Sequence, residues 1–402
     1  MLPEVKRYDW VFVLLTVAIA GYRSLRNLVV PLGRLNVVTG ANGSGKSSLY
    51  RALRLLADTA QGNVVQSIAQ EGGLVSTLWA GPEIIGKAVK AGEYAVEGTP
   101  RKHVVSVRLG FASDEYSYLI DLGYPPQERG SVSVFVRDPE IKQECIWFGP
   151  TLRPSAVLVE RNSSVVRQRG DGGEWTVVET NLPTYDSMML RVADPRTAPE
   201  VIALRESIRN WRFYDHFRAD AEAPARGHPI GTRTPILSND GRDLAAAIAT
   251  IREIGDVDGL EHAIDDAFPR SRIEIYVSDG RFALKMHQHG LLRALDTAEL
   301  SDGTLRYLLW IAALLTPRPP ALMVLNEPET SLHPDLLPAL ARLIARASEK
   351  TQVIVVSHAQ TLIAALAQNP DCRCLQLEKN FGETQLAGQS WHDTPAWRWP
   401  KR

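Results

Sequence analysis

The chain has 402 residues, of which 45% are hydrophobic and 23% are charged, and its formal net charge is −1. These values are typical of a globular protein of two or three domains, or of one nucleotide-binding domain with a large insertion, and they exclude wholesale disorder. The near-zero net charge argues against nucleic-acid binding over the whole surface, but it is compatible with a local basic groove. Three cysteines, Cys145, Cys372 and Cys374, are too few for a zinc hook or a disulfide framework, so we expect reduced thiols.

The first apolar run, residues 10–20, follows Lys6 and Arg7 and resembles the start of a signal peptide. Because the run is too short to span a bilayer, we interpret residues 13–19 as the first strand of the sheet that carries the next motif. No other segment approaches a transmembrane length, so we expect a cytoplasmic protein without a membrane partner. Residues 28–31 predict a second strand, and the turn before it places Arg23 near the next motif, unless Arg23 is only a surface charge.

The spacing Gly-Ala-Asn-Gly-Ser-Gly-Lys-Ser-Ser at residues 40–48 is that of a phosphate-binding P-loop. A predicted strand at residues 34–39 leads in and an apolar-striped helix leads out, which is the context that the motif requires. Glycines permit the positive φ that turns N–H groups inward, and the helix N-terminus attracts anions. We expect Lys46 to reach the β- and γ-phosphates and Ser47 to bind Mg²⁺. The predicted nucleotide contacts are Gly40, Asn42, Gly43, Ser44, Gly45, Lys46, Ser47 and Ser48.

The middle of the chain changes from helical to strand-like patterning and back. Residues 55–80 are predicted to be helical, and three glutamines there are alternative candidates for a water or Mg²⁺ contact: Gln61, Gln66 and Gln70. An antiparallel meander is predicted from the strands 104–109, 116–122, 131–137, 141–148, 156–161 and 164–168. Helices follow at 199–210, 243–254 and 258–267, with a long loop at 221–238 and a hairpin of 273–278 and 281–287. The absence of a sustained heptad repeat makes a long coiled-coil arm unexpected.

Polar residues follow one helix start and two strand ends in the last third. Ser301 fits the N-cap of an apolar helix and Gly303 leaves N–H groups uncovered, so this start is either a second anion site or an ordinary cap. A strand at 321–325 ends before Glu327, which we expect to orient or deprotonate the water that attacks the γ-phosphate. A strand at 352–356 ends before His358, a candidate γ-phosphate sensor or a structural histidine. The alternating pattern, with helices at 334–348 and 360–367 and a last strand at 374–378, predicts a parallel sheet built from both ends of the chain.

Taken together, residues 40–48, 300–306, 325–334 and 353–358 resemble the Walker A, signature, Walker B with D-loop, and switch-histidine motifs of ABC-type ATPases. The chain is most similar to the RecF-like and OLD-like bacterial "AAA family ATPase" proteins, which are related to SMC proteins. Three short motifs of this chain recur in those proteins: Gly-Tyr-Arg-Ser, Leu-Ser-Asp-Gly-Thr and Glu-Pro-Glu-Thr-Ser-Leu-His-Pro. Residues 235–244 resemble an insertion-region motif of the same group. The resemblance implies an α/β P-loop NTPase fold with a mixed or parallel core sheet, an antiparallel β lobe and a helical insertion. It also implies ATP and Mg²⁺ as cofactors, with Ser301 and Gly303 binding the γ-phosphate held by the other subunit of a head-to-tail homodimer.

By this resemblance, residues 1–60 and 296–380 form the two parts of the ATPase core. Residues 61–295 are an insertion, with a β-rich lobe near 100–180 and a helical lid near 195–295, and residues 381–402 are a tail. OLD-like nucleases carry a Toprim domain after the core, and the short remainder here leads us to expect none. Three tryptophans of the tail are predicted to pack onto the body or a partner: Trp391, Trp397 and Trp399.

Asn326 departs from the family, because aspartate usually stands there and its charge holds the Mg²⁺ water shell. Asparagine keeps a hydrogen-bonding oxygen but loses the charge. We therefore expect Ser47 and Asn326 to lie at the Mg²⁺ ion, with weak retention of Mg²⁺ and slow hydrolysis of ATP. One function is an ATP-hydrolysing switch acting on DNA or a protein, in DNA repair or phage defence. The alternative is an ATP-gated clamp or sensor in which hydrolysis is dispensable. A DNA partner or a solvated face explains the arginines Arg205, Arg209, Arg212 and Arg218.

Overall fold

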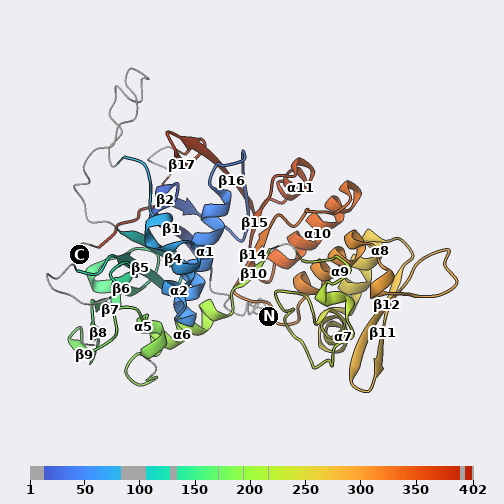
Figure 1. The fold of residues 1–402 in the computed structure, drawn as a ribbon, viewed down its shortest axis with the longest axis horizontal. Helices are drawn as coiled ribbons and strands as arrows, with labels where there is room; N and C mark the ends of the chain where they lie inside the picture. The colour runs from blue at the N-terminus through green and yellow to red at the C-terminus, as the bar shows by residue number, and fades with distance from the viewer. Residues whose placement is uncertain are drawn as a thin grey trace, which may run out of the picture. The chain divides into compact units, whose positions relative to one another are not determined.

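The computed structural model describes residues 13–82, 106–126, 134–170, 172–192, 194–215, 217–389 and 394–400. The chain forms two compact units, and most of their helices and strands are labelled in Figure 1. Unit 1 comprises Met1–Gly33, Gly40–Trp211 and Leu375–Arg402, and unit 2 comprises Arg34–Thr39 and Arg212–Cys374. The chain leaves unit 2 within strand β3 (Leu35–Gly40), so the strand and the loop after it are joined covalently but belong to different units.

Unit 1 is built on an eight-stranded antiparallel sheet with the order β2-β1-β4-β5-β6-β7-β8-β9. Its strands are β1 (Leu14–Tyr22), β2 (Leu25–Pro31), β4 (Val107–Ser113), β5 (Tyr116–Gly123), β6 (Glu140–Phe148), β7 (Val157–Asn162), β8 (Val165–Arg169) and β9 (Trp175–Glu179). Strand β1 pairs with β2 and β4. The expectation that residues 13–19 share a sheet with the strand before the P-loop is therefore wrong.

The predicted meander is confirmed for β4 to β8, whereas the strand predicted at residues 131–137 is wrong where the structure describes it. Residues 134–137 form bends and turns, and residues 131–133 lie outside the described part. Val134 and Phe135 are exposed, so their strand propensity is not supported by a neighbouring strand, and strand preference depends on such packing. Strand β9 was not predicted.

One face of this sheet is covered by helices, of which α1 is the longest. The helices are α1 (Lys46–Gln61), α2 (Val64–Gln70), α3 (Gly73–Thr77), α5 (Met188–Arg191) and α6 (Pro199–Arg209). Helix α1 contacts α2, α5 and α6 as well as β1 and β4. It ends at Gly62, whose φ of 75° is the left-handed conformation typical of a helix C-terminus. The hairpin of β16 (Cys372–Asn380) and β17 (Glu383–Leu386) lies near the end of the chain, with β17 against β2.

The tail packs onto unit 1, as predicted for two of its three tryptophans. The ring of Trp397 lies 5.7 Å from that of Trp147 and 5.2 Å from that of Trp399. A side chain at Gly110 would place its Cβ 2.7 Å from the Trp397 ring, so a glycine is needed there. Trp391 lies outside the described residues.

The second sheet has six strands in the order β10-β14-β15-β3-β16-β17, and its first four strands are parallel and belong to unit 2. They are β10 (Arg212–Tyr214), β14 (Leu322–Asn326), β15 (Gln352–Val356) and β3. Asn326 is opposite Val356, and Val356 is opposite Val38, so the strands end at one edge of the sheet. The predicted parallel sheet from both ends of the chain is confirmed.

Helices pack against this sheet and enclose one apolar core. They are α7 (Leu244–Ile254), α8 (Val257–Ala267), α9 (Asp302–Leu314), α10 (Leu337–Ser348) and α11 (Gln360–Leu366). The predicted helices of this region are confirmed, and α9 contacts α7, α8 and α10. The fully buried Trp310 of α9 stacks edge-on against Phe217 and Tyr214. A smaller sheet of β11 (Arg272–Ser278), β12 (Arg281–His287) and β13 (Leu295–Asp296) confirms the predicted hairpin.

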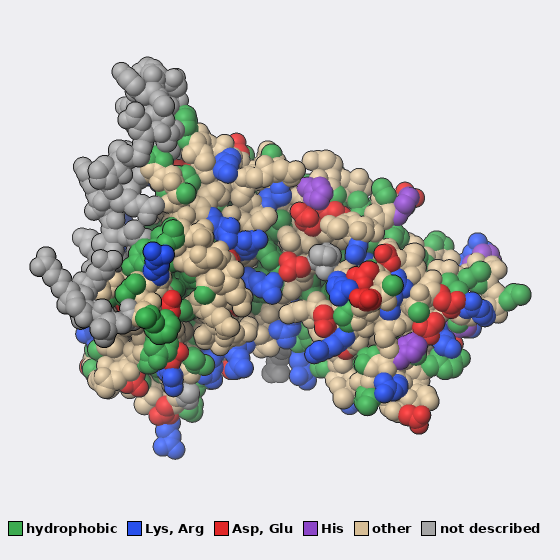
Figure 2. Space-filling model, viewed as in Figure 1, with side chains coloured by type: hydrophobic (Ala, Val, Ile, Leu, Met, Phe, Trp, Pro, Cys, Tyr) green, Lys and Arg blue, Asp and Glu red, His purple; other side chains and the backbone are tan. Residues whose placement is uncertain are grey.

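Short 3₁₀ turns connect several of these elements, at Pro154–Ala156, Pro224–Arg226, Thr297–Glu299 and Pro334–Leu336. Over the helices of unit 2, the face seen in Figure 2 carries acidic and basic side chains interspersed rather than segregated. Within the described part of the chain, no helix has both the length and the apolar character needed to cross a membrane.

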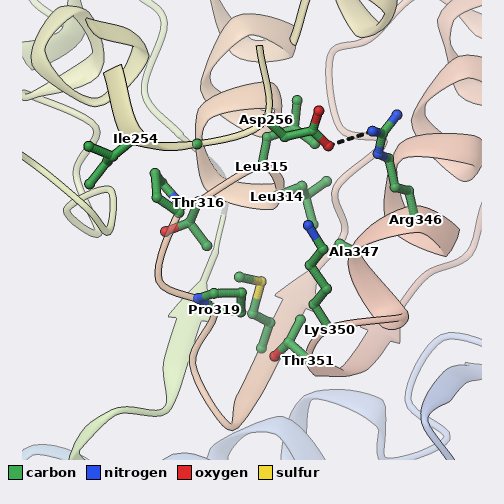
Figure 3. A pocket seen from close by; sticks show the side chains of 13 residues that line it. Ile254, Asp256, Leu314, Leu315, Thr316, Pro319, Arg346, Ala347, Lys350 and Thr351 are labelled. Atoms are coloured by element: carbon green, nitrogen blue, oxygen red, sulfur yellow. Dashed lines mark hydrogen bonds and ion pairs between the residues drawn. The ribbon is translucent and has the colours of Figure 1, made fainter. Parts of the chain in front are cut away.

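A cavity of about 240 Å³ in unit 2 lies at the opposite end of the parallel strands from Asn326 (Figure 3). It is lined by Met323, near the start of β14, and by Thr351, directly before β15. At its rim Asp256 caps α8 by accepting a hydrogen bond of 2.9 Å from the Gly259 N–H and forms an ion pair with Arg346 of α10. The Gly259 hydrogen bond, aided by Arg346, lowers the pKa of Asp256.

We expect Asp256→Asn to destabilise the protein at neutral pH but not in acid. Because the pKa of Asp256 is lower in the folded chain, its charge contributes stability that is present above the unfolded value of about 3.9 and is lost as the pH falls through the folded value. Asparagine retains the cap, and the ion pair is partly solvated, so the loss should be below about 1 kcal/mol. Urea unfolding against pH measures it. Asp279→Asn, at an exposed hairpin tip, is the control, and a pH-independent loss would contradict the assignment.

Candidate nucleotide-binding and ATPase site

The loop after β3 has the backbone that its sequence predicts. Gly40, Gly43 and Gly45 have φ values of 144°, 78° and 110°. A Cβ at Gly40 would lie 2.3 Å from the Leu377 carbonyl oxygen, and one at Gly45 would lie 2.2 Å from Thr384 Oγ1. A Cβ at Gly43 would meet nothing within 4 Å. Gly40 and Gly45 are therefore required for both conformation and space, whereas Gly43 is required for conformation alone.

The start of α1 fits an anionic group. No side chain caps this helix and no acid lies in its first turn, so its first N–H groups keep the positive end of the helix dipole uncovered. The Lys46 ammonium donates to the carbonyl oxygens of Gly40 at 2.6 Å and Ala41 at 3.1 Å, folded over the loop. Ser44 Oγ is buried with no hydrogen-bond partner in the described part, whereas Asn42 and Ser47 are exposed. These features fit the phosphates of a nucleotide.

The floor of the loop comes from the two ends of the chain. The Thr384 hydroxyl, on β17, lies 2.8 Å from both the Ser44 carbonyl oxygen and Ser24 Oγ. The Thr384 N–H donates to the Ser24 carbonyl oxygen at 2.8 Å. Sequence reasoning placed Thr384 in a tail and missed this role, because no local pattern predicts a contact across 340 positions.

Arg23 is held by an acid that the sequence did not single out. Its guanidinium forms an ion pair of 2.7 Å with Glu71, which also accepts a 2.6 Å hydrogen bond from the Tyr22 hydroxyl. Burial, with the Glu71 carboxylate, raises the pKa of Tyr22. Glu71 accepts hydrogen bonds from Nε and Nη2 of Arg23, and the phosphate contact of Arg23 stays a prediction. The three candidate glutamines lie on α1 and α2, and their positions do not distinguish one from another.

In unit 2, the ends of β14 and β15 bring three predicted residues together. Glu327 N–H donates to the Val356 carbonyl oxygen at 2.8 Å, and Glu327 has a φ of 48°, which costs a non-glycine residue about 1–2 kcal/mol. His358 Nδ1 lies 3.7 Å from Glu327 Oε1, and the two side chains are 57% and 45% exposed. Asn326 Nδ2 lies 3.4 Å from Asp215 Oδ1. An accessible carboxylate, an imidazole and an amide thus share the edge at which β3 also ends.

Glu329 organises this edge and was quoted in the motif without a role. Its Oε1 accepts hydrogen bonds from the Ser357 hydroxyl at 2.7 Å, the His358 N–H at 2.9 Å and the Ala359 N–H at 3.2 Å. His358 Nδ1 is 3.4 Å from the same oxygen. Glu329 is buried, and its Oε2 has no partner in the described part. The backbone at His358 and Ala359 is therefore fixed by this carboxylate.

The signature segment begins a helix, as predicted. Ser301 is the N-cap of α9 and its Oγ accepts a hydrogen bond of 3.2 Å from the Thr304 N–H. The nearest atom to a Cβ at Gly303 would be the Ser331 carbonyl oxygen at 3.4 Å, so the helix start is uncrowded. One turn later the buried Arg306 donates to the Thr330 carbonyl oxygen at 2.8 Å. That contact ties the signature helix to the segment after Glu329.

The fold and these motifs define a P-loop ATPase domain of the ABC type, as found in SMC heads. The chain belongs to the family described as "AAA domain, putative AbiEii toxin, Type IV TA system", whose model matches residues 35–364. The mixed α/β fold expected from the sequence is confirmed. Membership supports nucleotide binding by this chain.

Solved SMC heads resemble the chain over nearly its whole length. A head bound to the C-winged helix domain of ScpA is 12% identical, with 94% of this chain and 98% of that chain covered and a TM-score of 0.50. A head with an extended coiled coil bound to the C-terminal domain of ScpA, derived from Pyrococcus furiosus, is 11% identical (95% and 97% covered, TM-score 0.47). The SMC head domain from Thermotoga maritima is 15% identical (94% and 99% covered, TM-score 0.40). No functionally curated protein matches the chain.

Alanine at two glycines of the loop should separate conformation from space. We expect Gly45→Ala to lower the melting temperature without nucleotide and to abolish binding of a fluorescent ATP analogue. The new Cβ would also lie 2.8 Å from Thr384 Cγ2 and 3.0 Å from its Cβ, so rotating Thr384 gives no relief. Gly43→Ala adds only the left-handed strain of about 1–2 kcal/mol. Equal losses of melting temperature in the two variants would contradict this packing.

Proposed function

We propose that this protein binds ATP at the P-loop and hydrolyses it slowly, as a dimerising switch of the RecF and SMC kind. The observation that carries the proposal is the register of β3, which lies parallel to β15 and continues directly into Gly40. The neighbouring strands end at Asn326 and before His358. Because the carboxyl ends of parallel strands share an edge, β3 ends at the edge of unit 2 that carries Asn326, and the phosphate-binding loop follows β3 directly in the chain.

The proposed roles rest on the chemistry that each side chain offers. Lys46, with the N–H groups at the start of α1, binds the phosphates, and the exposed hydroxyl of Ser47 is available to Mg²⁺. Mg²⁺, when bound, neutralises charge on the phosphate oxygens. Glu327 orients the attacking water and takes its proton, and His358 senses the γ-phosphate from a position fixed by Glu329. Asn326 is neutral, so without a further acidic group it would hold the water shell of Mg²⁺ only weakly.

The second half of the site is proposed to come from another copy of the chain. Ser301 is exposed at the start of α9, and Gly303 leaves that start uncrowded. The γ-phosphate of an ATP bound by the P-loop of one subunit fits the N-terminus of α9 in the other subunit. Because Arg306 ties α9 to Thr330, contact with a phosphate at Ser301 would be transmitted to the segment beside Glu329.

The partner of this cytoplasmic switch is proposed to be DNA or a protein, in DNA repair or phage defence. The SMC head bound to the C-winged helix domain of ScpA supports a protein partner by analogy of fold. DNA has weaker support, because acids accompany three of the four arginines that suggested it. Arg205 and Arg209 contact Glu206, and Arg218 contacts Asp220. The alternative function, an ATP-gated clamp in which hydrolysis is dispensable, is favoured by one observation, the neutral Asn326.

We expect Glu327→Gln to trap ATP and to form stable dimers. Glutamine keeps the shape of the side chain but cannot accept the proton, so turnover should fall by about 10²–10⁴-fold while ATP binding is retained. Light scattering after size exclusion, with and without ATP, measures the dimer, and phosphate release measures turnover. If the variant stays monomeric at saturating ATP, the proposed dimerisation is wrong. If the ATP-trapped dimer is fully active with its partner, hydrolysis is dispensable and the alternative function, an ATP-gated clamp, is favoured.

Mixing two inactive variants tests whether Ser301 acts in trans. Lys46→Ala removes the phosphate ligand and Ser301→Arg blocks the signature helix start, so each homodimer should be inactive. A mixed dimer of a two-site sandwich contains one intact site, made of the P-loop of one chain and the signature of the other. Partial recovery of ATPase activity on mixing is expected. Failure to recover activity, with mixed dimers demonstrated, would contradict the shared site.

A further inference from the structure

The neutral Asn326 has an acidic neighbour on the adjacent strand. Strand β10 lies parallel to β14, with Tyr214 opposite Leu325, so the next residues along the two strands are Asp215 and Asn326. Tyr214 and Leu325 both point into the core that the helices cover. Since successive side chains of a strand alternate between faces, Asp215 and Asn326 both lie on the other face. The observed 3.4 Å between Asn326 Nδ2 and Asp215 Oδ1 agrees with that placement.

This contact fixes the polarity of the Asn326 amide. Its NH₂ group faces the carboxylate, so its Oδ1 is the atom left to accept a hydrogen bond from elsewhere. Asp215 is half-buried, and ionised it carries one unit of negative charge. Together the pair presents the amide oxygen and the negative charge that a single aspartate at position 326 would combine. The charge has moved by one strand while remaining at the same edge.

We infer that Asp215 supplies the negative charge that Asn326 lacks and helps to hold the water shell of Mg²⁺; this rests on the proposed function. Mg²⁺ keeps several of its waters in proteins and is bound through one or two carboxylates, so a carboxylate one strand away is a suitable partner for that shell. Metal retention should then be stronger than Asn326 alone predicts. Asp215 has this role because of its place at the end of β10, which joins the sheet beside β14.

The test is Mn²⁺ binding to the full chain saturated with a non-hydrolysable ATP analogue, with free Mn²⁺ followed by electron paramagnetic resonance. We expect Asp215→Asn to weaken Mn²⁺ affinity by about 10- to 100-fold, since that is the effect of losing a group that orients the ligands of a metal. Binding of the analogue in EDTA should be unchanged. The double variant Asp215→Asn, Asn326→Asp returns the charge to the neighbouring strand and should regain the affinity. Asp279→Asn, which removes a distant carboxylate of the same unit, should match the wild type.

Asn326→Asp alone tests the same charge if Asp215→Asn does not fold. Where Asp215 already supplies the charge, a second carboxylate should change Mn²⁺ affinity by less than about threefold, because two like charges at this distance disfavour each other. A gain of about tenfold or more would show that no charge was present, and would overturn the inference. So would wild-type affinity in Asp215→Asn.

These outcomes are distinct from failure of the proposed function. A wild-type chain that binds no ATP analogue in EDTA or with Mn²⁺ would remove the proposed function, and the role of Asp215 with it. A chain that binds the analogue, loses it in Lys46→Ala, and keeps full Mn²⁺ affinity in Asp215→Asn would leave ATP binding intact and remove only the role of Asp215.

Discussion

The parallel pairing of β3 with β15 and of β15 with β14 is the constraint on which the candidate site depends. A parallel ladder requires every strand to point the same way, so the residues directly after each strand emerge at one edge. That edge receives the loop after Thr39, the acid after Asn326 and the histidine after Ser357. A shift of one residue in the pairing of β10 with β14 would place Asn326 opposite a side chain of the other face and would separate it from Asp215. The buried Glu329, with its three donors from residues 357–359, fixes the edge once the strands are in place.

Much of this arrangement was accessible from sequence because its signals are local. The glycines of residues 40–45, the N-cap at Ser301 and the apolar strands ending at Asn326 and before His358 are each defined by their own neighbours. Strand and helix limits in unit 2 were therefore predicted closely. Residues 134–137, the described part of a strand predicted at 131–137, form bends and turns, because strand propensity without packing against a neighbouring strand does not make a strand. Strand β1 was placed in the wrong sheet for a related reason: the sequence of a strand does not identify the strands with which it pairs.

The residues that sequence reasoning missed act through contacts between distant positions. Glu71 binds Arg23 across 48 positions, and Asp215 approaches Asn326 across 111. Asp215 gives a weak local signal, an acid at the end of a short strand, which gains its meaning only from the strand beside it. The sequence shows that asparagine replaces the expected aspartate at position 326, but it does not show that the Asp215 carboxylate lies beside this asparagine. Substitutions at a motif are best interpreted together with the strand that flanks it.

The floor of the P-loop has a consequence for how the protein is made. Ser44 is synthesised early, but Thr384, whose hydroxyl donates a hydrogen bond to the Ser44 carbonyl oxygen, is synthesised 340 residues later. Closing so long a loop is slow relative to forming local contacts, and it cannot begin while the second partner is still unsynthesised. A growing chain therefore carries the complete phosphate-binding sequence long before it carries the phosphate-binding structure. Binding of ATP at this loop is then expected only after the segment that carries Thr384 has been synthesised and has folded against the Ser44 carbonyl oxygen.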